Sequence, residues 1–447
     1  MVVAAYQIWF NPLMISSTER VFAICWLTAV VIWLSGAIAA DPALVAGQES
    51  SVTLPGSNGT MKVFLPSNYA ADRKWPAIFF YHGMGGTPDT AAIRKFTDGR
   101  DYIVVGMPYL EDDHARTQQE MDAYMRRELA NFQVARNWLL AHASVDDSNV
   151  YMGGASKGGW TTVTIGEMAL PQLAGMVVLI AGRNSMPGKP AVVQGLQGKS
   201  IYVGAGETDP NLVPALRARE FYRKNGAAVT FEEYPGRGHE LPVEATKLRA
   251  WLQVHARPRQ TAVPEAVRKE WTSAVDAEAK TAAAVADPVL KYEHLKDLAE
   301  DPRLSLCEKP VADQVKTQLA AVVKASPGKE EWDAEVRFSE AIYREATIQR
   351  LSDMQAAVEG LRGVVQTYPA THFGRIAAKY LPKLDEAYKK SMDATAKANA
   401  GKAAAAPPDT ATKVKPGFPI DGISRDQPPG MPVRKGNTIT FKQPGEK

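Results

Sequence analysis

The chain has 447 residues, which is too long for one typical domain, so two or more structural units are expected. Hydrophobic residues make up 45% and charged residues 23% of the sequence, as in ordinary globular proteins. The net charge is only +3, and the positive excess is in the segment from Gly401 onward, so there is no footprint of a nucleic-acid-binding protein.

Residues 1–39 are expected to be a signal peptide or a membrane anchor. Arg20 precedes an uncharged run over 21–40, whose strongly apolar part has the length of a signal-peptide core and is short for a membrane span. The Ala-Ile-Ala at 37–39 offers a cleavage site, so a cleaved signal is favoured over an anchor. Met14 is an alternative start because the stretch before Arg20 is long and nearly uncharged. Either reading predicts export to the periplasm or beyond, with membrane contact only through an anchor.

Two cysteines bear on the redox state of an exported chain. Cys25 lies inside the apolar segment and has no lipobox around it. After cleavage Cys307 would be the only cysteine, so no intramolecular disulfide is expected and stability must come from the core.

Strand-like and helix-like segments alternate between about residues 50 and 255. Apolar runs expected to form strands cover 51–54, 61–65, 77–81, 102–107, 150–153, 176–180, 201–203 and 229–234. Helices are expected between them, notably over 115–143 and 214–225. This alternation predicts an α/β domain over 40–257 with a mostly parallel sheet, whose ligands gather at the carboxyl ends of the strands.

The composition changes after Arg257. Residues 258–400 are rich in Ala, Glu, Lys and Leu and poor in Gly, which predicts an α-helical region. A break at 368–371 divides a helix pair that is either tetratricopeptide-like or part of an irregular helical appendage. Residues 401–447 contain eight prolines and are expected to be a disordered tail.

Gly154-Ala155-Ser156-Lys157-Gly158 reads G-x-S-x-G and follows the strand-like 150–153. A serine on such a strand-to-helix turn projects its hydroxyl out of the fold, and the glycines allow close packing around it. Ser156 is therefore the candidate nucleophile, and it needs a base, an acid and donors for an oxyanion.

Of the seven histidines, His239 is best placed to be the base, because it follows the last predicted strand in a Gly-rich loop. The acid should follow the preceding strand, where Asp209 is preferred and Glu207 is the reserve. Ser156, Asp209 and His239 then follow the chain order expected of an elbow-type hydrolase. A plain surface histidine and a helix-capping aspartate are the alternative interpretations.

The segment His82-Gly83-Met84-Gly85-Gly86 follows the buried strand at 77–81. Its glycines would let backbone N–H groups approach a substrate oxygen, so the backbone N–H groups of Met84 and Lys157 are the expected oxyanion donors. A Gly-rich turn without a ligand is the alternative. His82 is expected to be structural.

Through these motifs, residues 50–256 resemble the α/β-hydrolase superfamily, and within it secreted esterases of the dienelactone-hydrolase, polyhydroxybutyrate-depolymerase and feruloyl-esterase type. The resemblance rests on HGMGG, GASKGG, the Gly-Glu-Thr-Asp turn and the Gly-His loop, and it covers under half of the chain. Lys157 departs from the usual Met, Gln or Leu. Dienelactone hydrolysis itself is not expected, because position 156 is serine rather than cysteine.

The resemblance implies an exported serine esterase that forms an acyl-enzyme. A prolyl-oligopeptidase-like peptidase and a non-catalytic scaffold on a hydrolase fold are the alternatives. Trp160, Tyr109 and His114 are expected to bind substrate, although Trp160 could equally be core. The Lys157 ammonium is expected to reach solvent or to attract acidic substrates.

The segment 181–200 is too short for a lid, which favours an open cleft for soluble or polymer-borne esters. The sequence shows no metal-ligand spacing and no phosphate-binding loop, so no metal and no cofactor are expected. The partner of the helical region is not indicated.

Overall fold

The computed structural model describes residues 43–54, 59–110, 118–186, 188–242, 244–256 and 263–405, and only the backbone of 118 and 399–405. The predicted signal or anchor segment, with Met14 and Cys25, lies outside the described residues. The same holds for His114 and for the tail from 406 onward.

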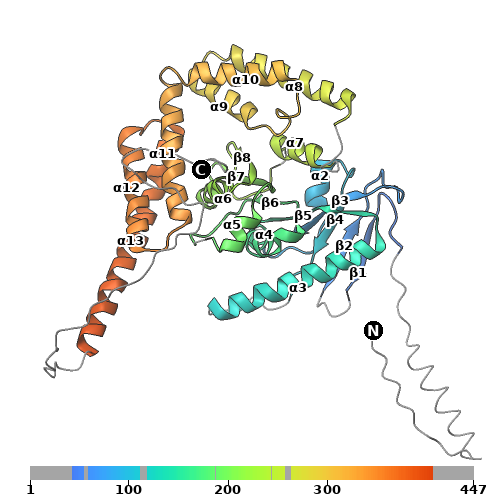
Figure 1. Ribbon diagram of the computed structural model, residues 1–447, viewed down its shortest axis with the longest axis horizontal. Coiled ribbons are helices and arrows are strands. Elements are labelled where there is room, and N and C mark those ends of the chain that lie inside the picture. Colours follow the sequence, from blue (N-terminus) through green and yellow to red (C-terminus); the bar gives the residue numbers. More distant parts are fainter. Residues whose placement is uncertain are drawn as a thin grey trace, which may run out of the picture. The chain divides into compact units, whose positions relative to one another are not determined.

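One eight-stranded sheet forms the centre of the fold, in the order β1-β2-β4-β3-β5-β6-β7-β8 (Figure 1). Its strands are β1 (Glu49–Thr53), β2 (Thr60–Phe64), β3 (Trp75–Tyr81), β4 (Ile103–Met107), β5 (Val145–Ala155), β6 (Gly175–Leu179), β7 (Ser200–Gly206) and β8 (Ala228–Tyr234). β1 and β2 run antiparallel to each other, and β2 runs antiparallel to β4. All other neighbours are parallel, as the alternating pattern predicts.

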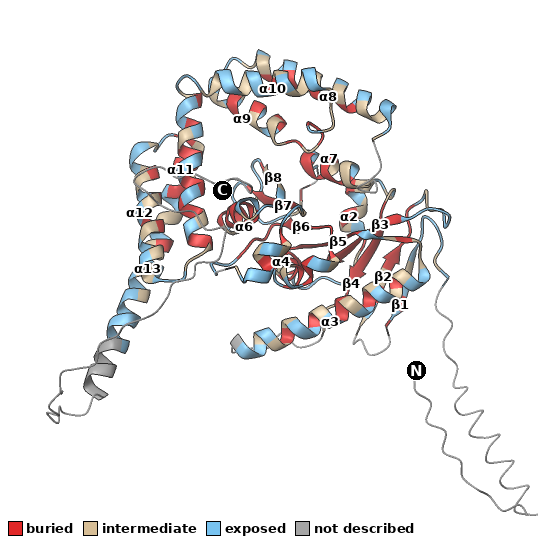
Figure 2. Ribbon diagram, viewed as in Figure 1, coloured by how far each residue is buried: buried red, intermediate tan, exposed pale blue. Residues whose placement is uncertain are grey.

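The central strands are buried on both faces, which explains their continuous apolar sequences. Every residue of β3, β4 and β6 is buried (Figure 2). Parallel strands of this kind need helices on both sides of the sheet. In the described part of the sheet domain the helical elements are α2 (Ala91–Thr97), α3 (Gln118–His142), α4 (Lys157–Ala169), η1 (Leu170–Gln172), α5 (Pro190–Gly195), α6 (Leu212–Lys224) and α7 (Thr246–His255).

Side chains alternate between two cores along each strand. Phe79 of β3 and Met152 of β5 pack in one core with residues of α3, α4, α5 and α6. Their neighbours Ile78 and Tyr151 pack in the other core with residues of α2 and α7. The period of two therefore places α2 and α7 on the face of the sheet opposite the other helices.

Six helices follow the sheet domain, in agreement with the composition. They are α8 (Glu265–Ala284), α9 (Pro288–Ala299), α10 (Lys309–Val322), α11 (Gly328–Ala346), α12 (Leu351–Thr367) and α13 (His372–Ala405). The predicted break at 368–371 falls between α12 and α13. Helix α13 ends at Ala405 and so includes 401–405, the first five residues of the predicted tail, because alanine is the strongest helix former.

Some of the helices after the sheet domain share the hydrophobic core of the sheet, and others form a smaller core of their own. Phe338 and Ile342 of α11 and Leu361 of α12 belong to the same hydrophobic cluster as the sheet residues. A smaller cluster joins α8, α9 and α10. Backbone contacts group the chain up to Asp393 into one compact unit, and Ala394 begins a second unit.

A chain of buried polar contacts fastens α11 to α6 and to the loop after β6. Arg217 of α6 pairs with Glu345 of α11, whose carboxylate also accepts hydrogen bonds from Ser185 and Tyr380. Arg183, only 1% exposed, donates to the backbone oxygen of Ala346 at 3.0 Å. The charged side chains of α6 and α11 lose their water when the two helices pack together. Each buried charge therefore needs its oppositely charged partner.

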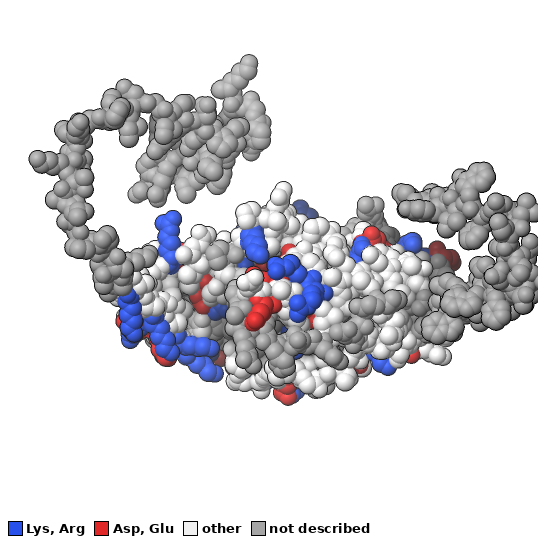
Figure 3. All heavy atoms as spheres, turned by 90° about the horizontal axis from the view of Figure 1, so that it is seen from below, with Lys and Arg blue, Asp and Glu red and all other residues white. Residues whose placement is uncertain are grey.

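The surface carries charges of both signs. On the face shown in Figure 3, Lys and Arg lie beside Asp and Glu among uncharged residues. None of the helices in the described ranges combines the length and the apolar character that crossing a bilayer requires.

Candidate active site

Ser156 stands between the end of β5 and the start of α4, with φ 54° and ψ −118°. A positive φ is strained for a residue with a side chain, and here the close packing of the turn imposes it. A Cβ on Gly154 would lie 2.2 Å from the oxygen of Gly158. A Cβ on Gly158 would lie 2.0 Å from the oxygen of Tyr81. Only glycine fits at either position.

Three side chains that are far apart in the sequence form one line of hydrogen bonds. Ser156 Oγ lies 2.8 Å from His239 Nε2. His239 Nδ1 lies 3.0 and 3.1 Å from the two oxygens of Asp209. Nδ1–H therefore donates to the carboxylate, which leaves Nε2 to accept the serine proton.

The side chains in this line of hydrogen bonds differ in their exposure to solvent. The side chain of Asp209 is fully buried, whereas that of His239 is 38% exposed. A buried carboxylate holds the imidazole in one orientation and stabilises its protonated form. The exposed side of the ring and the serine hydroxyl remain accessible to a substrate.

The turn after β7 also separates the two candidate acids. The backbone N–H of Asn211 donates to Asp209 Oδ1 at 2.7 Å, which fixes the carboxylate beneath His239. Glu207 instead accepts the backbone N–H of Gly236 at 2.8 Å and forms no bond with His239. The structure thus brings Asp209, and not the reserve Glu207, to the imidazole.

Asn211 is a site neighbour that the sequence analysis missed. Its Nδ2 donates to the backbone oxygen of Ile180 at 3.0 Å and lies 3.5 Å from His239 Nδ1. Its place two residues after Asp209 was the available signal. It joins the loop after β6 to the turn after β7.

The loop after β3 lies against the nucleophile turn. A Cβ on Gly83 would lie 3.6 Å from both the oxygen of Ala155 and Cβ of Ser156. His82 Nδ1 is bonded to the oxygen of Gly83 at 2.7 Å, and Tyr109 Oη donates to the oxygen of His82 at 2.8 Å. His82 is therefore used within the loop, as the sequence suggests.

The two expected oxyanion donors are the backbone N–H groups of Met84, in the loop after β3, and of Lys157, next to Ser156. The Met84 N–H forms no hydrogen bond within the described residues, and its side chain is 82% exposed. Lys157 is the first residue of α4, so its amide belongs to the positive end of that helix. The positive end of a helix favours nearby negative charge.

The Lys157 side chain does not simply extend into water. Its Nζ lies 4.6 Å from the centre of the Tyr109 ring. Glu128 of α3 is fully buried nearby and accepts the Leu110 N–H at 2.7 Å. Burial raises the pKa of Glu128, and the positive charge of Lys157 opposes this rise.

Of the three residues expected to bind substrate, the structure describes Tyr109 and Trp160. Tyr109 and Trp160 are half-buried and pack against the main core, so Trp160 does contribute to packing. His114 lies outside the described residues. Among the residues that the structure describes, no group of His, Cys, Asp and Glu is arranged to hold a metal ion.

Comparison with known proteins agrees with this architecture. Residues 51–160 match the family model described as "Putative esterase", a stretch from β1 to the first turn of α4 that includes the loop after β3 and Ser156. No curated protein matches the sequence.

Three solved structures illustrate the likeness. A CE1 ferulic acid esterase from Anaeromyces mucronatus is 18% identical over 43% of this chain and 84% of its own, with a TM-score of 0.35. A thermostable esterase from Pseudomonas putida is 17% identical over 56% and 94%, with a TM-score of 0.37. An esterase from Pyrobaculum calidifontis is 16% identical over 54% and 92%, also with a TM-score of 0.37.

At these identities and TM-scores the likeness carries no argument about the site or the substrate. The strand order and the turn at Ser156 assign the fold as that of the α/β-hydrolases. The chain thus has an α/β-hydrolase fold in which residues 51–160 match an esterase family model.

Proposed function

We propose that this protein hydrolyses carboxylic esters through an acyl-enzyme on Ser156. The observation that carries the proposal is the line of hydrogen bonds from Ser156 through His239 to Asp209, at the carboxyl edge of a parallel sheet. Each residue has a partner suited to acyl transfer, and the base is oriented by a fully buried acid.

In the first step, Ser156 Oγ attacks the ester carbonyl and His239 Nε2 takes the serine proton. The carbonyl oxygen becomes negative and is stabilised by the backbone N–H groups of Met84 and Lys157. Asp209 keeps Nδ1–H directed toward itself and stabilises the imidazolium. His239 then gives its proton to the leaving alcohol, which departs as the acyl-enzyme forms.

In the second step, water replaces the alcohol. His239 removes a proton from the water, the resulting hydroxide attacks the acyl carbon, and Ser156 leaves with the returned proton. Among its described residues, the segment between β6 and β7 forms only the six-residue helix α5, which supports an open cleft for soluble or polymer-borne esters. Residues 1–39 support export, which N-terminal sequencing of protein from the periplasmic or culture fraction would test.

The central test replaces the nucleophile. Ser156→Ala is expected to lower kcat for p-nitrophenyl acetate by about 10⁴-fold or more, because no other group forms the acyl-enzyme. A fluorophosphonate probe should label the wild type and not the variant. If the variant retains full activity, or if the wild type is not labelled at Ser156, the proposed function fails and a scaffold role gains support.

A further inference from the structure

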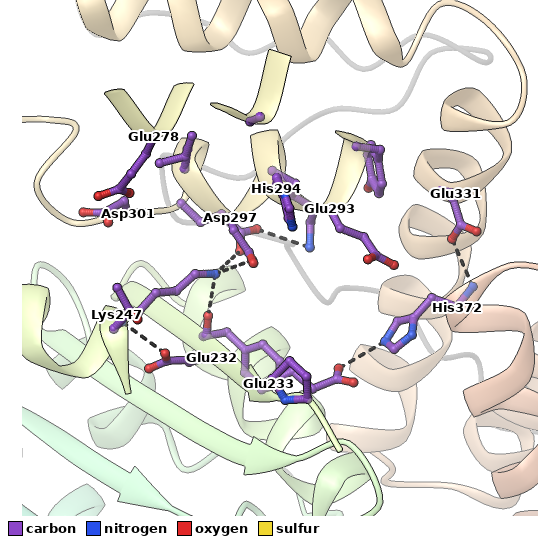
Figure 4. Close-up of a pocket in the computed structure, with 18 of the residues that line it drawn as sticks. Glu232, Glu233, Lys247, Glu278, Glu293, His294, Asp297, Asp301, Glu331 and His372 are labelled. Carbon is purple, nitrogen blue, oxygen red and sulfur yellow. Dashed lines mark hydrogen bonds and ion pairs between the residues drawn. The ribbon is translucent and has the colours of Figure 1, made fainter. Parts of the chain in front are cut away.

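A large cavity lies outside the Ser156–His239–Asp209 line. It has a volume of about 720 Å³ and lies between β8 and α7 of the sheet domain and the helices α8, α9, α11 and α13 (Figure 4). None of the three proposed catalytic residues lines it. Its volume falls within the range of small-molecule sites.

The inner wall of the cavity is apolar. Phe231 and Phe373 line it and are 7% and 6% exposed, and Leu298 adds aliphatic surface. The Arg219 guanidinium already lies 5.1 and 5.7 Å from the centres of the two aromatic rings. This wall therefore suits an aliphatic chain better than another cation stacked on a ring.

Acidic groups dominate the rest of the lining. Nine of the lining residues are Asp or Glu, against four Lys or Arg: Glu207, Glu232, Glu233, Glu278, Glu293, Asp297, Glu300, Asp301 and Glu331, against Arg219, Lys247, Lys296 and Arg375. Such an excess attracts cations and repels anions.

The carboxylates are spread along the cavity. In Figure 4, Glu278 and Asp301 lie at one end, Glu233, Glu293 and Glu331 lie toward His372 at the other end, and Asp297 lies between them. Glu278 comes from α8, Asp301 from the turn after α9, Glu293 and Asp297 from α9, Glu233 from β8 and Glu331 from α11. Carboxylates spread along the cavity beside an apolar wall match a molecule that carries more than one positive group on an aliphatic chain.

The end around His372 has more carboxylates than Lys or Arg side chains, since Glu233, Glu293 and Glu331 face only Arg375, His294 and His372 among the described lining residues. Glu293 forms no hydrogen bond or ion pair within the described residues. Glu331 is only 4% exposed, and the only hydrogen bond to its carboxylate comes from the backbone N–H of His372 at 3.0 Å. A buried carboxylate with so little compensation is costly, and a bound cation would remove that cost.

The ionisation of these groups agrees with the contacts. Burial raises the pKa of Glu293, the charges of His372 and His294 lower it in part, and those of Asp297 and Glu233 raise it. Burial also raises the pKa of Glu331. His372 bonds Glu233 at 3.1 Å, and the charges of His372 and Arg375 oppose the rise in the pKa of Glu331.

Toward the opposite end the protein neutralises its own acids more fully. Arg303 binds Asp301 at 2.7 Å and Glu278 at 3.2 Å, and Lys247 binds Asp297 at 2.6 Å. The Asp297 side chain is nevertheless 62% exposed, so it can accept a further donor. We propose that the cavity binds a linear aliphatic diamine or polyamine, with one ammonium among Glu233, Glu293 and Glu331 and another at Asp297.

Isothermal titration calorimetry of the full chain tests this proposal, with putrescine, spermidine and n-butylamine as probes at about 0.1 M salt. Putrescine and n-butylamine share a four-carbon chain and differ by one ammonium. We expect putrescine and spermidine to bind at one site, with at least about tenfold higher affinity than n-butylamine. Absence of binding, or equal binding of the monoamine, would overturn the proposal.

Two variants locate the site. Glu293→Gln and Glu331→Gln should each weaken spermidine binding by about tenfold or more. Glu270→Gln, an exposed α8 residue outside the cavity, is the matched control and should bind as the wild type does. Because Glu293 makes no contact of this kind with the protein, its replacement should leave the melting temperature unchanged and the result interpretable.

Blocking Ser156 with a fluorophosphonate separates this site from the catalytic cleft. The blocked protein should retain the full affinity for spermidine. Loss of binding in the blocked protein, or unchanged binding in both Glu293→Gln and Glu331→Gln, would place the amine elsewhere and overturn the proposal. The outcome does not depend on whether the protein is an esterase.

Discussion

Asp209 is the residue whose role depends most on its surroundings. Its side chain is fully buried, lies 3.0 Å from His239 Nδ1 and accepts the Asn211 N–H. Glu207, two residues earlier, is tied to Gly236 instead. Two carboxylates in one short turn are thus directed to different tasks, one to the imidazole and one to the loop that carries it.

The first prediction tests this division. Asp209→Asn should keep the shape of the turn but lower kcat for p-nitrophenyl acetate by about 10⁴-fold, because an amide does not select the productive imidazole tautomer. Glu207→Gln is the control and should stay within about tenfold of the wild type, since only one loop hydrogen bond changes. A larger loss in Glu207→Gln than in Asp209→Asn would reverse the assignment.

Sequence motifs identify some features of the site and miss others. Ser156, His239 and Asp209 could be selected from the sequence because each follows a strand whose carboxyl end meets the same edge of the sheet. The contact of Lys157 with Tyr109 could not be selected in this way. It depends on the directions of two side chains, which no spacing rule specifies.

At the scale of elements, α6 is held from both sides. It packs on the sheet and on α11, and its arginines Arg217 and Arg219 are 6% and 3% exposed. Arg217 pairs with Glu345, and Arg219 binds Glu335 at 3.2 Å. Because α6 begins just after Asp209, the helices after the sheet domain support the turn that carries the proposed acid.

The second prediction compares a buried and an exposed ion pair across the α6–α11 contact. Glu345→Gln should lower the free energy of unfolding by about 3 kcal/mol, since it leaves Arg217 buried without its counter-charge. Glu340→Gln removes an exposed partner of Lys224 at 2.9 Å and should cost less than about 1 kcal/mol. Urea unfolding monitored by tryptophan fluorescence measures both; equal losses would contradict the argument.

The third prediction concerns His372, where α13 meets β8. Although burial opposes protonation, the hydrogen bond to Glu233 and the charges of Glu233 and Glu293 raise the pKa of His372 above 6.5, and Arg375 counteracts them in part. A raised folded-state pKa means that the contribution to stability is fully present below the unfolded pKa and is lost as the pH rises through the folded pKa.

His372→Gln should therefore destabilise the protein at about pH 5.5, by on the order of 1 kcal/mol, and much less at about pH 9. Thermal melting at the two pH values measures this difference. His294→Gln, an exposed neighbour on α9, should show no such pH dependence. A deficit of equal size at both pH values would show that the imidazole contributes through packing and not through its charge.

For the molecule as a whole, the main hydrophobic core contains residues from both sides of the change in composition after Arg257. It includes Phe79 of β3 and also Phe338 and Ile342 of α11. Apolar surface buried in this way contributes about 25 cal/mol per Å². The helical region up to Asp393 is thus part of the compact unit that holds the sheet.

The fourth prediction follows from this shared core. A chain shortened after Ala256 would expose apolar surface on α6 that α11 covers in the intact protein, so it should aggregate or melt well below the full-length protein. Soluble yield, size-exclusion chromatography and thermal melting measure the outcome. A soluble, monomeric fragment with an unchanged melting temperature would show that the sheet domain is independent.

The sequence was sufficient for the sheet, the helical region and the order of the site residues, because periodicity and turn chemistry are local properties. It could not reveal the shared core, the Arg217–Glu345 contact or the acidic cavity beside β8. Those features join residues more than 100 positions apart, and their energies depend on desolvation and orientation, which arise only when the chain is packed.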